Sequence, residues 1–127
     1  MRIALDTNAY VAYFRNDPEI LHRIQQAEMI LLPFVVLGEL RGGFLGGRQS
    51  EQNERRLAEF LNSPRVQPLF PDEQTTHHYA RLYLQLRKQG TPIPINDLWI
   101  AALVIQHDLI LCSRDAHFEH LPQLARA

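Results

Sequence analysis

The chain has 127 residues, of which 46% are hydrophobic and 21% charged, so it is long enough for one domain with a single packed core. Thirteen basic residues stand against fourteen acidic ones, and the net charge of -1 excludes both a polybasic nucleic-acid binder and an acidic tail. All the basic residues except Lys88 are arginine, the side chain suited to bidentate contact with phosphate.

Further classes are excluded by what the chain lacks. Cys112 is the only cysteine, so there is neither a disulfide framework nor a cysteine-rich zinc site. The N-terminus reaches Asp6 before an apolar signal region forms, and we therefore expect no secretion signal. The longest uncharged run, Met29 to Gly38, is shorter than the roughly 20 residues of a membrane span. We expect a cytoplasmic protein.

The first third of the chain alternates short apolar runs with helical patterns. Arg2 to Leu5 predicts a buried strand, and Thr7 to Phe14 has apolar residues at helical spacing. A second helix is predicted to begin at Pro18, capped by Asp17. Met29 to Leu32 predicts a second strand that ends before a proline.

The middle of the chain continues this alternation. The segment from Phe34 to Leu45 is apolar with one acid, Glu39, inside it, and glycine pairs loosen its end. Gln49 to Leu61 predicts a charged helix with one apolar face, and Arg65 to Phe70 predicts a short strand.

Two longer helices and a last strand complete the pattern. Asp72 to Gln89 predicts a helix ended by Gly90, and its apolar stripe is expected to belong to the core rather than to a binding face. The stripe comprises Tyr79, Leu82, Tyr83 and Leu86. Asn96 to His107 is apolar nearly all round and predicts a buried helix, and Leu109 to Cys112 predicts a strand. The alternation predicts an α/β domain with a mostly parallel central sheet flanked by helices.

Four carboxylates interrupt this pattern where it predicts core or core edge: Asp6, Glu39, Asp97 and Asp115. An isolated buried carboxylate is costly, so each requires a partner or a metal ion. The chain has one lysine, and the nearby Arg41 and Arg114 cannot obviously serve four acids. Oxygen ligands of this kind select Mg²⁺ or Mn²⁺.

Each acid also has a simpler interpretation. Asp6 and Asp97 suit helix N-caps, and Asp115 suits an ordinary polar turn. Glu39 can point outward along a polar stripe with Arg41. Taken one at a time, the caps and the turn are favoured, whereas the four acids together favour a site.

Four short motifs resemble those of PIN-domain ribonucleases, in order and spacing. They are Leu5 to Asn8, Val36 to Gly43, Asn96 to Ala102 and Leu111 to Phe118. The resemblance covers the whole chain and predicts one PIN-like nuclease domain over residues 1–127. The size is similar to that of the single-domain VapC-type toxins of prokaryotic toxin–antitoxin pairs.

The resemblance implies a metal-dependent endoribonuclease that hydrolyses RNA phosphodiesters and thereby inhibits translation. It implies that one or two Mg²⁺ or Mn²⁺ ions are held by the catalytic quartet Asp6, Glu39, Asp97 and Asp115. Asn8 and Ser113 match supporting polar positions. A homodimer held inactive by a cognate antitoxin protein is also implied.

Residues around these motifs have less specific interpretations. Arg41 and Arg114 are candidate RNA contacts, and Arg41 is preferred because it follows Glu39 by two positions. His117 is expected to pack or to form a turn bond rather than to bind metal, and Trp99 to lie in the core or at a dimer surface. For the tail from Leu121 to Ala127, a final strand and an irregular segment both fit the sequence.

Three other functions fit parts of the sequence. A phosphoacceptor receiver domain has a similar length, but it needs a central Asp and a lysine after a late strand, where this chain has Arg114. A phosphatase of the haloacid dehalogenase type needs a second Asp where Asn8 stands. The third is a catalytically silent RNA- or partner-binding protein, and the presence of all four acids argues against it.

Overall fold

The alternation of apolar runs and helical patterns gives eleven elements in the computed structural model, which describes all 127 residues. In chain order the elements are β1 (Arg2–Leu5), α1 (Thr7–Phe14), α2 (Pro18–Gln26), β2 (Met29–Pro33), α3 (Phe34–Leu45), α4 (Ser50–Leu61), β3 (Val66–Leu69), α5 (Glu73–Gln89), α6 (Ile95–Gln106), β4 (Ile110–Cys112) and the 3₁₀ helix η1 (Ala116–His120). Every predicted strand and helix is present, and the predicted ends differ from these by about one residue, as fraying ends do.

Local capping signals begin and end several of these helices. Asp6, Asp17 and Asp72 each accept a backbone N–H at the first turn of α1, α2 and α5, which satisfies donors that have no partner within the helix. Gly90 ends α5 with a left-handed backbone (φ 72°), a conformation that a residue with a Cβ atom adopts only under strain. The cap predictions for Asp6 and Asp17 are thereby confirmed.

The four strands form one parallel sheet in the order β3-β2-β1-β4, which confirms the predicted sheet. The chain builds outward from β1 through β2 to β3 and then returns to place β4 on the other side of β1. The strand order therefore reverses beside β1. In open parallel sheets, ligands bind outside the carboxyl ends of the strands at such a reversal. The residues that follow β1 and β4 are thus brought to the position where a site is expected.

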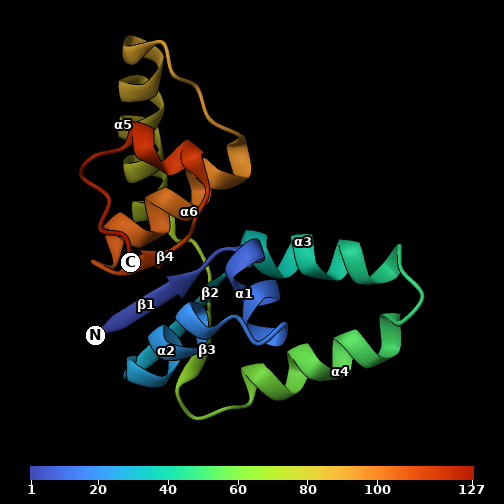
Figure 1. Cartoon of the computed structure of the whole chain (residues 1–127). Helices are drawn as coiled ribbons and strands as arrows, with labels where there is room; N and C mark the ends of the chain where they lie inside the picture. The colour runs from blue at the N-terminus through green and yellow to red at the C-terminus, as the bar shows by residue number, and fades with distance from the viewer.

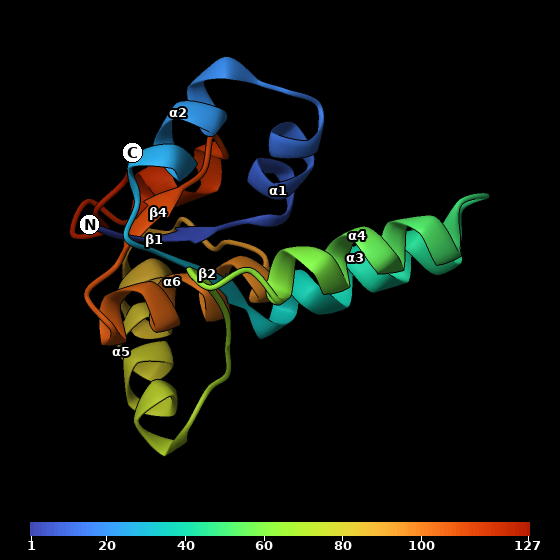
Figure 2. The same ribbon diagram turned by 90° about the horizontal axis from the view of Figure 1, so that it is seen from below.

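Helices cover both faces of the sheet. Figure 2 shows α1 and α2 on one face and α5 and α6 on the other. Helices α3 and α4 run side by side and extend away from the sheet as a hairpin (Figures 1 and 2). None of the helices has the length and apolar character that crossing a membrane requires.

One apolar core joins the sheet to the helices, and α6 is its most buried helix. Residues Ile100 to Val104 of α6 are all buried, as predicted. Helix α5 packs against α6 through Leu82 and Leu86. The prediction that the whole α5 stripe is core is wrong for Tyr83, which is 50% exposed, because the stripe is wider than the surface that α6 covers.

The C-terminal tail adds a single parallel bridge to the outer side of β4. Leu111 donates to the carbonyl of Ala125 (2.8 Å) and accepts from the N–H of Ala127 (3.0 Å). The tail therefore follows the sheet for one bridge only, without forming a strand. This contact brings Arg126 against the segment that follows β4.

Candidate metal centre

Asp6 joins β1 to α1 at the carboxyl edge of the sheet, with only 6% of the residue exposed. One carboxylate oxygen caps α1 by accepting the N–H of Ala9 (2.8 Å). The other accepts a short hydrogen bond from the Ser113 hydroxyl. The Ser113 hydroxyl oxygen in turn accepts the N–H of Asp115 (3.0 Å). The cap interpretation of Asp6 is thus correct for one oxygen, while the second oxygen connects β1 to the segment after β4.

Burial raises the pKa of Asp6 above its ordinary value. Hydrogen bonds from Ser113 and Ala9 oppose this increase, and the negative charges of Asp115 and Glu39 add to it. A buried carboxylate next to other carboxylates is costly to ionise unless a cation shares the site.

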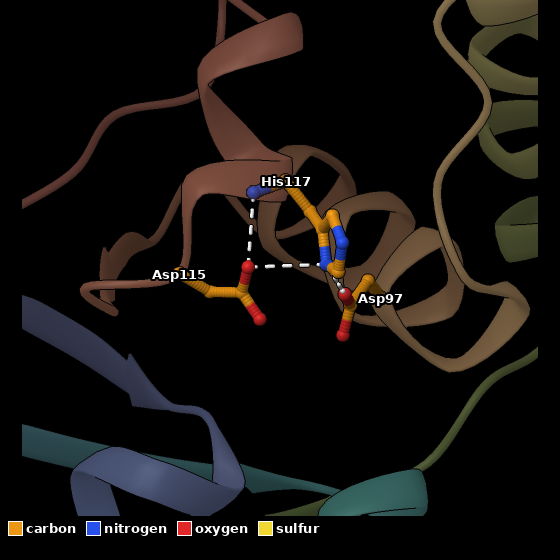
Figure 3. A group of neighbouring side chains, drawn as sticks. All are labelled: Asp97, Asp115 and His117. Atoms are coloured by element: carbon orange, nitrogen blue, oxygen red, sulfur yellow. Dashed lines mark hydrogen bonds and ion pairs between the residues drawn. The ribbon is translucent and has the colours of Figure 1, made fainter.

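Asp97 and Asp115 meet through the ring of His117, as Figure 3 shows. The Nδ1 atom of His117 lies 2.9 Å from Oδ2 of Asp97 and 3.0 Å from Oδ1 of Asp115. The N–H of His117 also donates to Oδ1 of Asp115 (2.9 Å). The backbone makes the expected turn bond, whereas the contact of the ring with both acids was not predicted from the sequence.

Asp97 lies in the first turn of α6, and 17% of its side chain is exposed. Burial raises the pKa of Asp97. The hydrogen bond with His117 opposes that increase, and the charges of Asp115 and Glu39 reinforce it. The N-cap of α6 is Pro94 and not Asp97, so the simple capping interpretation of Asp97 is wrong.

Glu39 approaches the same edge from α3 and is exposed. Its Oε1 atom accepts a hydrogen bond from the hydroxyl of Thr7 (2.7 Å). Thr7 is the residue that follows Asp6. Its charge acts on both Asp6 and Asp97. The four acids therefore come from four separate segments and interact at one edge of the sheet.

The supporting and RNA-contact candidates lie around this edge. Asn8 is exposed on α1 and lines a cavity of about 60 Å³ together with Arg114. Arg114 forms a bidentate pair with Asp17 (both 2.8 Å), which lowers the pKa of Asp17 to about 2. The Nε atom of Arg41 donates to Oε1 of Glu54 on α4 (2.8 Å). Both arginines therefore pair with acids outside the quartet.

The side chains at this edge offer ligand atoms that suit a divalent cation. No lysine or arginine forms an ion pair with any of the four acids, and His117 is the only basic side chain that contacts their carboxylates. Asp97, Asp115 and His117 each offer a ligand atom, all within 4.8 Å of one another. Carboxylate-rich sites of this kind suit Mg²⁺ and Mn²⁺.

Two residues of the site were not found by sequence reasoning. For His117, the only signal was its position two residues after Asp115, within a motif already identified. Arg126 had no local signal. Its guanidinium donates to the carbonyls of Ser113 and Asp115 (both 3.1 Å) and so holds the segment that carries them.

Comparison with known proteins finds similarities that extend over nearly the whole chain. The family model for the PIN domain matches residues 3–124. Ribonuclease VapC1 of Haemophilus influenzae is 33% identical over 125 residues, covering 94% of this chain and 92% of that protein. The structure of VapBC-1 from nontypeable Haemophilus influenzae matches with a TM-score of 0.88 and 31% identity, over 100% of this chain and 97% of that one. VapBC-5 from Mycobacterium tuberculosis, a member of the VapBC family of toxin-antitoxin systems, matches with a TM-score of 0.73 and 27% identity, over 100% and 97% of the two chains.

Proposed function

Because this chain belongs to the PIN domain family, we propose that it is a metal-dependent endoribonuclease and the toxin of a VapBC-type toxin–antitoxin pair. One observation carries the proposal: at the carboxyl edge of the sheet, the charges of four acids from separate segments act on one another, without a lysine or arginine ion-pair partner, and two of the acids lie together around His117. The ribonuclease and toxin–antitoxin names of the similar proteins support the substrate class and the biological setting. The nuclease domain extends over residues 1–127.

We assign the metal ligands to Asp6, Glu39, Asp97 and Asp115. When bound, Mg²⁺ or Mn²⁺ lowers the pKa of water and balances the charge on phosphate. Asp6 and Asp97, the two most buried acids, are the central ligands. Ser113 supports the site because its hydroxyl donates to Asp6 and also accepts the backbone N–H of Asp115. In the reaction, a water oxygen bonds to phosphorus, the bond from phosphorus to a ribose oxygen breaks, and that oxygen takes a proton.

The proposed biological setting extends the same proposal. We propose that the protein acts in the cytoplasm as a homodimer, inhibits translation by cleaving RNA, and is kept inactive by a cognate antitoxin; the VapBC names of the similar structures support the antitoxin partner. The PIN match argues against the receiver-domain alternative. The phosphatase of the haloacid dehalogenase type is disfavoured for the same reason.

Metal removal is the direct test of this function. We expect cleavage of structured RNA with Mg²⁺ or Mn²⁺, a loss of at least about 100-fold with chelator, and recovery when metal is added back, because the acids otherwise repel the phosphate. The measurement is the initial rate of cleavage on gels. Cleavage that is insensitive to chelator would contradict the metal assignment. RNA binding without any cleavage would instead identify a catalytically silent binding protein.

Replacing Arg41 tests the proposed RNA contact. We expect Arg41→Ala to weaken RNA binding about 3- to 10-fold and to make the slope of log affinity against log salt shallower by roughly one. Binding is measured in an Asp97→Asn background, which prevents cleavage. Arg81→Ala, an exposed arginine on α5, is the matched control. Equal affinity and slope for the parent and Arg41→Ala would limit Arg41 to its ion pair with Glu54.

A further inference from the structure

His117 lies among the proposed metal ligands, although the oxygen-only quartet does not include it. We propose that the Nδ1 atom of His117 is a nitrogen ligand of the bound cation. We further propose that this ligand shifts the preference of the centre from Mg²⁺ toward transition-metal ions such as Mn²⁺. The inference rests on the metal centre assigned above and adds to it one ligand and a selectivity.

The distances around Nδ1 suit metal coordination. In an octahedral ion with ligands at about 2.1 Å, neighbouring ligand atoms are roughly 3 Å apart. The Nδ1 atom lies 2.9 Å from an oxygen of Asp97 and 3.0 Å from an oxygen of Asp115. These separations match neighbouring positions of one coordination shell. The Nδ1 atom faces both carboxylates, so loss of the Nδ1 proton to solvent would leave a lone pair on the side of the ring where the two acids lie.

The position of His117 is fixed by its neighbours in η1. Its N–H donates to the same Asp115 oxygen that the ring contacts. The next residue, Phe118, is 1% exposed and anchors η1 in the core. The ring is therefore held against the two acids from the backbone side, while Asp97 approaches it from α6 (Figure 3). A ligand held in place before binding contributes more affinity than one that must be ordered.

The chemistry of the donors then sets the selectivity. Mg²⁺ binds oxygen ligands and keeps several waters, whereas imidazole is a ligand of transition-metal ions. A centre of carboxylates plus one imidazole should therefore gain Mn²⁺ affinity from His117 and little Mg²⁺ affinity. If His117 instead only occupies the space of a cation and moves away when one binds, removing the ring should leave Mn²⁺ binding unchanged or stronger.

Electron paramagnetic resonance of Mn²⁺ separates these cases. Titration gives the affinity, competition with Mg²⁺ gives the selectivity, and electron spin echo modulation detects a directly bound nitrogen. The samples are the parent, the parent labelled with ¹⁵N-histidine, His117→Gln and the matched control His120→Gln, an exposed histidine in the same 3₁₀ helix. Glutamine keeps a polar side chain but removes the ring nitrogen.

We expect nitrogen modulation in the parent that changes with the ¹⁵N label, persists in His120→Gln and is lost in His117→Gln. We also expect His117→Gln to bind Mn²⁺ about 10-fold more weakly, with a smaller change for Mg²⁺. Mn²⁺ binding without a nitrogen signal in the parent would overturn the inference and leave the carboxylate centre intact. Failure of the parent to bind Mn²⁺ at all would overturn both. The labelled parent decides the question even if His117→Gln does not fold.

Discussion

An Asp6→Asn variant is expected to lose at least about 100-fold in the rate of RNA cleavage while it retains the fold. The substitution removes the charge of the most buried acid in the site, so a divalent cation loses a central ligand. The amide oxygen of Asn can still cap α1 by accepting the N–H of Ala9, and the hydroxyl of Ser113 can rotate to suit the amide. Cleavage rate and circular dichroism, measured on the same preparation, check both parts.

The matched control is Asp108→Asn. Asp108 is an exposed acid whose positive φ of 52° suits Asn, and it lies outside the quartet. This control should cleave RNA at the parent rate. An Asp6→Asn protein that also cleaves at the parent rate would refute the assignment of Asp6.

Asp6→Asn should also leave the metal-free protein as stable as the parent or more stable at neutral pH. Burial raises the pKa of Asp6, so the folded protein holds this proton more tightly than the unfolded chain does. The ionised carboxylate therefore costs stability above the folded-state pKa, and the cost disappears as the pH falls below the ordinary pKa of Asp. The melting temperatures of variant and parent, measured with chelator, should differ most at neutral pH and converge in acid.

Phe118→Ala is expected to reduce the free energy of unfolding by about 3–5 kcal/mol, the range for removing a buried aromatic ring. Phe118 is 1% exposed and is among the largest fully buried side chains. A loss of this size is a large share of the roughly 5–15 kcal/mol by which domains are stable. Urea unfolding, followed by circular dichroism, gives the free energy.

Phe70→Ala provides the same chemical change on the surface, since Phe70 is 63% exposed. That control should cost no more than about 0.5 kcal/mol. Equal losses for the two variants would show that the burial of Phe118 does not stabilise the fold. Because η1 carries both Phe118 and His117, we also expect Phe118→Ala to lower the cleavage rate per folded molecule.

Local patterns in the sequence were sufficient to place the elements and to bring the acids to one edge. Asp6 follows β1 and Asp115 follows β4, and parallel strands align their carboxyl ends, so their proximity followed from the strand pattern alone. Glu39 stood out because it interrupts an apolar helical pattern and Asp97 because it precedes one, and the PIN-like motifs include both. Periodicity predicts which side of a helix is apolar, because that signal lies in residues a few positions apart in the chain.

Contacts between distant residues could not be predicted in this way. Arg114 pairs with Asp17, 97 positions earlier, and nothing local to either residue indicates the other. His117 reaches Asp97, 20 positions earlier, because α6 packs beside η1. Tyr83 belongs to an apolar stripe by spacing, yet its exposure depends on how much of α5 the neighbouring helix covers.

The return of the chain to β1 has a consequence for the protein during its own synthesis. Asp6 is made first, but β4, Ser113 and Asp115 reach it only after more than a hundred further residues have been translated. A nascent chain that stops short of β4 lacks both the strand that pairs with β1 and the hydroxyl that binds Asp6. Because a domain folds as a unit, the nuclease site cannot be complete before β4 and the segment after it have been made. A ribosome making this RNA-cleaving enzyme is therefore not exposed to a finished active site until the residues through Asp115 have been translated.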